Sequence, residues 1–148
     1  KIKKNVTNMA FSSDFIVGYP GESDYDFQET LELINEVKFA SSYSFCYSAR
    51  PGTPAATQDE IIPEEIKKTR LKHLQTILLK QQDEFNESFL NKEVEVLVTG
   101  KGKVEGQYVG RTPHLQPVHI MSSSDLVGKI LNIRIERLTS FSFHGKII

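Results

Sequence analysis

The residue types most able to do chemistry cluster around a short apolar run near the start of the chain. Asp14 precedes Phe15, Ile16 and Val17, and the run ends at Gly18, before the turn sequence Tyr-Pro-Gly-Glu. A carboxylate at the head of a buried strand needs a polar partner. Ligands of parallel α/β folds bind at the carboxyl ends of strands, where glycine lets the backbone approach a flat or charged group. The pattern indicates the edge of a cofactor pocket; the alternative is a plain strand-to-helix turn in which Asp14 binds backbone.

The spacing of apolar residues predicts the elements that position this run. Consecutive apolar residues at 15–17 are typical of a strand buried on both faces of a parallel sheet. Ser23, followed by two acidic residues, predicts a helix N-terminus, and apolar residues then recur at helical spacing as far as Val37. The aromatic-rich run 43–47 predicts a second parallel strand, which completes a β-α-β unit.

After residue 47 the sequence changes twice, first in composition and then in the spacing of its apolar residues. Residues 48–59 are rich in Pro and Gly and predict a loop, and a long helix is expected to begin at Pro63. After Asn91 the apolar period changes from 3.6 to 2, and glycines separate about five short strands, which favours a small barrel. We therefore predict an α/β part at residues 1–57, a connecting helix at 58–90 and an all-β barrel at 91–148.

The composition is that of a soluble globular protein. Of the 148 residues, 39% are hydrophobic and 25% are charged, and no apolar run approaches the roughly 20 residues of a membrane helix. The basic first residues lack the apolar core of a signal peptide. The single cysteine, Cys46, excludes an internal disulfide framework and a cysteine-ligated cluster within this sequence, and it agrees with a reducing cytoplasm. We expect Cys46 to be a small buried residue of its strand.

Charge is divided unevenly, although the net charge is only −1. Residues 1–90 contain 10 Lys and Arg against 14 Asp and Glu, whereas residues 91–148 contain 8 against 5. The second half is therefore the part expected to face a polyanion. Its surplus of positive charge is modest, and a solvated surface explains it equally well.

Two sequence motifs resemble a known family. The stretch SSDFIVGYPGES at residues 12–23, followed by a helix, a strand and SARPGTPAA at residues 48–56, closely resembles the later part of the radical-SAM domain of methylthiotransferases, specifically of the MiaB-type tRNA enzymes. The resemblance extends over nearly the whole chain and implies a C-terminal portion of such an enzyme. The first part is then the last β-α-β part of a partial β/α barrel that binds S-adenosylmethionine.

The second half resembles a TRAM domain, a small OB-like barrel at the ends of RNA-modifying enzymes. The matching pieces are VEVLV at 94–98, Gly-Arg-Thr at 110–112 and Leu-Val-Gly-Lys at 126–129. The chain departs from the family after Gly-Arg-Thr, because residues 113–120 read PHLQPVHI instead of an asparagine-rich turn and a V-V-N-F-like strand. This departure leaves open which polar groups of the loop touch RNA.

The resemblance implies a specific reaction and specific cofactors. The expected activity is methylthiolation of C2 of N6-isopentenyladenosine at tRNA position 37, with S-adenosylmethionine and two 4Fe–4S clusters as cofactors. The cluster ligands are expected upstream of Lys1, so this chain alone should be inactive. Its expected partners are the tRNA anticodon stem-loop and S-adenosylmethionine, and the full-length enzyme is expected to be monomeric and cytoplasmic, without membrane association.

Residue roles follow from the resemblance, each beside a purely structural alternative. Asp14 is expected to accept a hydrogen bond from the cofactor ribose, and Ile16, Val17 and Gly18 to line the adenine. Arg50 could pair with a carboxylate or phosphate at the barrel rim, or cap a helix. The expected RNA-binding residues are Lys101, Lys103, Tyr108, Arg111, His114 and Lys129. No metal site is predicted, since two histidines five positions apart, His114 and His119, are a weak signal.

Three other functions fit parts of the sequence. Sister methylthiotransferases act on threonylcarbamoyl-adenosine or on an aspartate of a ribosomal protein; Arg50, where the ribosomal enzyme tends to have an acidic residue, counts against the latter. A non-catalytic RNA-binding module is the third reading. Residues 1–57 argue against it, because a binding barrel has no use for a β-α-β unit with a pocket edge.

Overall fold

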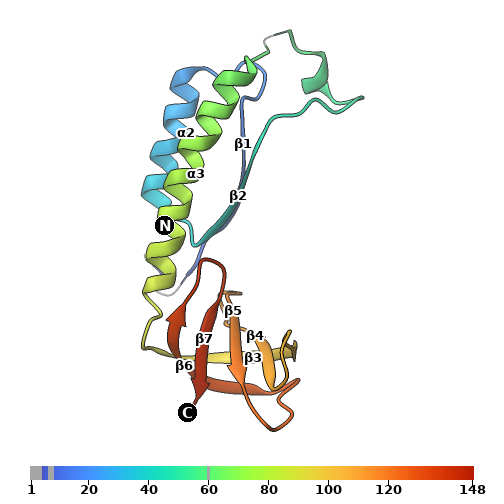
Figure 1. The fold of residues 1–148 in the computed structure, drawn as a ribbon. Helices are drawn as coiled ribbons and strands as arrows, with labels where there is room; N and C mark the ends of the chain where they lie inside the picture. The colour runs from blue at the N-terminus through green and yellow to red at the C-terminus, as the bar shows by residue number, and fades with distance from the viewer. Residues whose placement is uncertain (1–4, 7–8, 60) are drawn as a thin grey trace. The chain divides into compact units, whose positions relative to one another are not determined.

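The computed structural model describes residues 5–6, 9–59 and 61–148 and divides the chain into two compact units, residues 1–82 and 83–148 (Figure 1). The elements in chain order are β1 (Ser12–Val17), α2 (Asp24–Val37), β2 (Ser41–Cys46), the 3₁₀ helix η1 (Pro54–Thr57), α3 (Glu64–Glu87), β3 (Glu93–Lys101), β4 (Gln107–Arg111), β5 (Pro117–Met121), β6 (Ile130–Leu138) and β7 (Phe143–Ile147). The unit boundary falls within α3. The three-part division at residues 57 and 90 stays a prediction.

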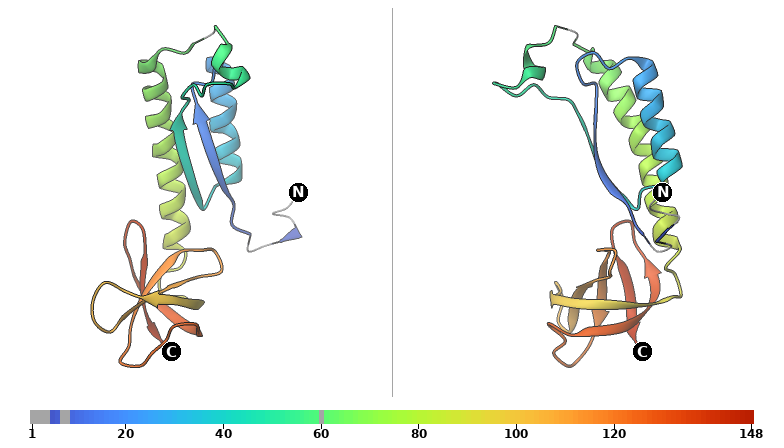
Figure 2. Two further views of the ribbon diagram at one scale, coloured as in Figure 1. Left: turned by 90° about the vertical axis from the view of Figure 1, so that its right-hand side faces the viewer. Right: turned by 180° about the vertical axis from the view of Figure 1, so that it is seen from behind.

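The first unit is built on the β-α-β arrangement that the sequence predicts. Strands β1 and β2 pair in parallel, with Asp14 beside Tyr43 and Ile16 beside Phe45. Helices α2 and α3 lie on one side of the two strands (Figure 2). The core between them consists of Phe15, Val17, Phe27, Leu31, Ile34, Phe39, Leu74 and Leu78.

The other face of this small sheet is uncovered, so the prediction of a strand buried on both faces is wrong for β1. Ile16 is 57% exposed, Tyr43 is 69% exposed and Phe45 is 55% exposed. Successive side chains of a strand point to opposite faces, and in the part of the chain that the structure describes the helices cover only the face of Phe15 and Val17. The consecutive apolar residues therefore predict the strand correctly but not what covers it.

Helix α2 begins and ends through side-chain hydrogen bonds. Ser23 accepts from the backbone N–H of Asp26 at 3.2 Å, and the Asp26 carboxylate accepts from the backbone N–H of Ser23 at 2.8 Å, which is a capping box. At the other end the buried amide of Gln81, from α3, donates to the carbonyl of Ile34 at 3.0 Å and accepts from the N–H of Phe39 at 2.9 Å. Gln81 thus bonds one carbonyl of the last turn of α2 and the backbone just after the helix, and it ties α3 to both.

The second unit is a closed barrel with strand order β3-β4-β5-β7-β6. All neighbouring strands are antiparallel except β5 and β7. Its core is formed by Val96, Val98, Tyr108, Val118, Ile120, Leu126, Ile133, Ile135 and Phe143. The predicted change from helical to strand period and the predicted five-stranded barrel are confirmed.

Candidate functional site

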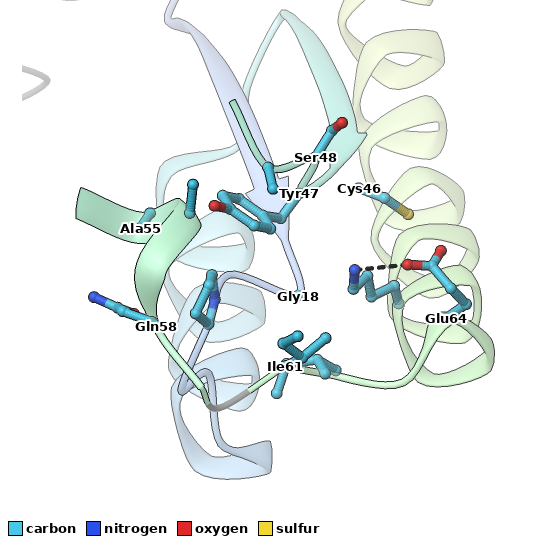
Figure 3. Close-up of a pocket in the computed structure, with 13 residues that line it drawn as sticks. Gly18, Cys46, Tyr47, Ser48, Ala55, Gln58, Ile61 and Glu64 are labelled. Carbon is cyan, nitrogen blue, oxygen red and sulfur yellow. Dashed lines mark hydrogen bonds and ion pairs between the residues drawn. The ribbon is translucent and has the colours of Figure 1, made fainter. Parts of the chain in front are cut away.

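A pocket of about 460 Å³ lies where β1 and β2 end, as expected for a parallel strand pair (Figure 3). Its lining includes Gly18, Tyr47, Ala55, Ile61, Glu64 and Lys67. The carboxyl ends of the two strands, the loop that contains η1 and the first turn of α3 therefore meet around one cavity of the first unit.

Gly18 begins the turn after β1 and has no room for a side chain. Its φ is +70°, a conformation that favours glycine, and a Cβ at this position would collide with the side chain of Lys67. The Gly18 N–H donates to the Glu22 carboxylate at 2.7 Å. The turn therefore depends on a backbone that only glycine adopts easily and on a carboxylate four residues later.

Arg70 holds that carboxylate from the opposite helix. Its Nη1 lies 2.6 Å from Glu22 Oε2, and its Nη2 lies 2.7 Å from Asp24 Oδ1. The side chains of Arg70 and Glu22 are only 7% and 11% exposed. Burial acts to lower the pKa of Arg70, but the hydrogen bonds to Asp24 and Glu22 outweigh it and raise that pKa. Arg70 remains a fixed cation that locks the β1–α2 turn at the pocket rim.

The polar side chains around the pocket differ in whether they have a hydrogen-bond partner. Lys67 is buried, and its ammonium pairs with Glu64 at 2.7 Å, a contact drawn in Figure 3. The hydrogen bond from Lys67 lowers the pKa of Glu64. The buried Tyr47 hydroxyl has no hydrogen-bond partner among the described residues, while its ring packs edge-on against Tyr19 with centroids 5.2 Å apart. A buried hydroxyl without a partner costs free energy, so Tyr47 is a point of lowered stability in the pocket wall.

The five residues predicted to contact the cofactor lie in four places. Asp14 and Ile16 are exposed on the uncovered sheet face, beside Tyr43 and Phe45. Val17 is only 1% exposed and faces the helices. Gly18 lines the pocket, and Arg50 is exposed in the following loop, where its carbonyl accepts hydrogen bonds from Thr53.

Sequence reasoning missed the residues that build the pocket rim. Glu22 was visible as the end of the Gly-Tyr-Pro-Gly-Glu turn, but Arg70, Lys67 and Tyr47 have meaning only through contacts across long sequence separations. The signal that could have revealed Arg70 and Lys67 is their position on the same side of α3 as Leu74 and Leu78, where an amphipathic helix normally has apolar residues.

The predicted RNA-binding residues of the barrel differ in accessibility. Lys101, Lys103, Arg111 and Lys129 are exposed. Tyr108 is 7% exposed and belongs to the barrel core. The His114 ring packs against Phe85 and Phe89, with ring centroids 5.7 Å from each. The four cations are therefore accessible to a polyanion, whereas both rings lie in packed surroundings.

Two further findings concern the described part of the chain. It contains no group of three or more His, Cys, Asp or Glu side chains placed to bind a metal ion. None of its helices combines the length and the apolar character needed to cross a membrane.

Comparison with known proteins found a family match for the barrel and a relative that is similar over the whole chain. Residues 87–148, which include all strands of the barrel, match the family described as the TRAM domain. The chain is also 45% identical over 148 residues, or 99% of its length, to the tRNA-2-methylthio-N(6)-dimethylallyladenosine synthase of Rickettsia canadensis (strain McKiel). The resemblance to MiaB-type methylthiotransferases with a TRAM domain is thereby confirmed. The chain spans 33% of the length of that relative.

Proposed function

We propose that this chain forms the cofactor-pocket rim and the RNA-binding end of an enzyme that methylthiolates C2 of N6-isopentenyladenosine at position 37 of tRNA. The observation that supports this most strongly is the 45% identity to a tRNA-2-methylthio-N(6)-dimethylallyladenosine synthase, which extends over both structural units. A TRAM match alone would support only an RNA-associated barrel. The added similarity of the β-α-β unit favours an enzyme over a separate binding module.

The uncovered sheet face has the chemistry that the adenosine part of S-adenosylmethionine requires. Ile16 and Phe45 expose apolar surface on neighbouring strands, and the Asp14 carboxylate lies on the same face. Asp14 would accept hydrogen bonds from ribose hydroxyls, and Ile16 would contact the adenine. Val17 and Gly18 would contribute backbone at its edge. Arg50 would pair with the carboxylate of the cofactor.

The residues of this face therefore fit the cofactor, whereas the described residues contain no group of three or more side chains placed to bind a metal. We place the ligands of the two 4Fe–4S clusters in the remainder of the whole protein. Bound S-adenosylmethionine and the two clusters would supply radical chemistry. The proposed reaction needs it because no side chain with an ordinary pKa activates the adenine C2–H bond.

The residues of this chain would bind and orient rather than react. Arg70 and Glu22 hold the turn after β1, and thus the backbone of Gly18, in one conformation. In the barrel, exposed cations would contact the tRNA phosphates without reading sequence. These are Lys101, Lys103, Arg111 and Lys129.

Purified full-length protein with reconstituted clusters tests the substrate assignment. We expect mass spectrometry to detect a 2-methylthio group on tRNA that contains N6-isopentenyladenosine, and none on matched tRNA that contains threonylcarbamoyl-adenosine. The matched tRNA is the control, because both substrates present the same fold and phosphate charge to the barrel. Product on the threonylcarbamoyl substrate alone, or on a ribosomal protein alone, would assign the enzyme to a sister activity.

A further inference from the structure

A row of four side chains crosses the outer surface of the barrel. The strand registers place Val109 of β4 beside His119 of β5, His119 beside His144 of β7, and His144 beside Arg137 of β6. The residues that alternate with the two histidines point into the core: Val118, Ile120 and Phe143 are at most 1% exposed. Since side chains alternate along a strand, the histidines face outward.

The two imidazole rings of this row stack on each other. Their centroids are 5.0 Å apart and their planes differ by 27°. Both residues are half-buried, and the buried Nδ1 of His119 has no hydrogen-bond partner among the described residues. Neither histidine belongs to the hydrophobic core of the barrel, so the pairing of the two rings lies on its outer face.

The surroundings of the stacked rings are apolar on one side and cationic on the other. Met121 follows His119 on the same face of β5 and is 63% exposed. Arg137 lies beside His144, and Lys146 follows His144 on the same face of β7; both cations are exposed. The carboxylate next to Arg137 in the sequence is that of Glu136, an exposed residue at the register shift of β6. Aromatic rings with flanking cations suit single-stranded nucleic acid.

We propose that His119 and His144 form a stacking site for an unpaired RNA base, with Arg137 and Lys146 on the adjacent phosphates. This site rests on the proposed tRNA-binding function and gives it a location. His119 lies on β5, the third strand of the barrel, and in OB-type barrels the face of the second and third strands binds oligonucleotides. His144, Arg137 and Lys146 extend the site from that strand onto β7 and β6. The occupant is an unpaired nucleotide rather than a duplex, because only an unstacked base exposes a ring face.

The protonation state of His144 agrees with this role. Burial, then the nearby Arg137, then His119 lower the pKa of His144 below its ordinary value of 6.5. At neutral pH His144 is therefore uncharged, and its ring lies beside Arg137 and His119 without electrostatic repulsion.

Fluorescence anisotropy with the 148-residue chain tests the site. The probes are a labelled tRNA anticodon stem-loop and a labelled blunt RNA duplex of equal charge. We expect the double variant His119→Ala, His144→Ala to bind the stem-loop roughly tenfold more weakly, while His119→Phe, His144→Phe stays within about threefold of wild type, because phenylalanine keeps the stacking surface. Duplex binding should not distinguish the variants.

One control variant and two further variants separate loss of the stacking site from a general loss of surface contacts. The double variant Leu97→Ala, Ile130→Ala removes an exposed apolar pair between β3 and β6 and should leave stem-loop affinity unchanged. Arg137→Ala and Lys146→Ala each remove one phosphate contact and should reduce the salt slope of stem-loop binding by about one. Circular dichroism melts verify that each variant is folded. If the His119→Ala, His144→Ala variant does not fold, the salt slopes of Arg137→Ala and Lys146→Ala test the site instead.

The outcomes distinguish failure of the site from failure of the proposed function. Unchanged stem-loop affinity in the folded alanine pair, an equal loss in the phenylalanine pair, or unchanged salt slopes would overturn the stacking site alone. A wild-type chain that binds neither RNA would contradict the RNA-binding function and the site with it.

Discussion

Arg70 shows how a single residue can determine the shape of a site that it does not enter. It joins two carboxylates of the β1–α2 turn to α3, and Glu22 in turn holds the Gly18 N–H. Charged pairs this well buried depend on both partners, because removal of one leaves the other desolvated and unpaired.

Arg70→Ala should therefore lower the free energy of unfolding by about 3 kcal/mol, since Glu22 would stay buried without its cation. Arg70→Lys should lose about 1 kcal/mol, because an ammonium cannot hold both carboxylates in a planar fork. Urea denaturation of the chain measures both. Lys68→Ala, which breaks the exposed pair with Glu65, is the matched control and should cost under about 0.5 kcal/mol. Equal losses in Arg70→Ala and Lys68→Ala would contradict this account.

For single residues, the sequence shows which types are present more readily than where their side chains lie in the fold. Tyr108 was selected for its aromatic ring, yet the strand register turns that ring into the barrel core. His119 and His144 lie 25 positions apart in the sequence, and only the parallel pairing of β5 and β7 brings them together. Asp14 was placed correctly on β1, but the face it shares with Tyr43 and Phe45 depends on pairing that no local pattern specifies.

Two glycines show what closing a small barrel requires of its strands. A Cβ on Gly145 would collide with Ile133 and lie 2.6 Å from the carbonyl oxygen of Arg134. A Cβ on Gly110 would collide with Val96 and lie 2.7 Å from the carbonyl oxygen of Leu97. Both glycines therefore allow a neighbouring strand to approach more closely than a side chain permits.

Gly145→Ala should destabilise the barrel by about 1–3 kcal/mol, because the added methyl group forces backbone to move. Gly100→Ala is the matched control: it also lies in the barrel sheet, at the register shift of β3, but a Cβ there meets nothing within 4 Å. Thermal unfolding followed by circular dichroism measures both. Midpoints that fall equally in the two variants would show that strand propensity, not close approach, controls the effect.

The elements were largely predictable where their signals are local. Ser23 and its acidic neighbours mark the start of α2, and the valines of 94–98 mark β3 by their period. The helical spacing of apolar residues also reached the observed end of α2 at Val37. The contact of Gln81 with the carbonyl of Ile34 was not predictable, because Gln81 lies far along the chain. The uncovered face of β1 was missed for the same reason: an apolar run indicates burial but not the element that provides it.

At the scale of the whole molecule, the change from a 3.6-residue to a 2-residue period predicts two kinds of structure, and the chain forms two units. The acidic and basic halves of the sequence match this division approximately. The proposed reaction could not be inferred from composition or periodicity. It rests on the SSDFIVGYPGES and SARPGTPAA motifs, and on a relative of which this chain spans 33%.

Nucleoside mass spectrometry of tRNA from cells that lack the full-length protein tests whether the protein methylthiolates N6-isopentenyladenosine. We predict that the 2-methylthio group disappears from position 37 while the N6-isopentenyl group remains, and that return of the full-length gene restores the 2-methylthio group. The retained isopentenyl group is the internal control, since it shows that the substrate was made and only the methylthiolation step was lost. Unchanged 2-methylthio-N6-isopentenyladenosine in those cells would contradict the proposed function.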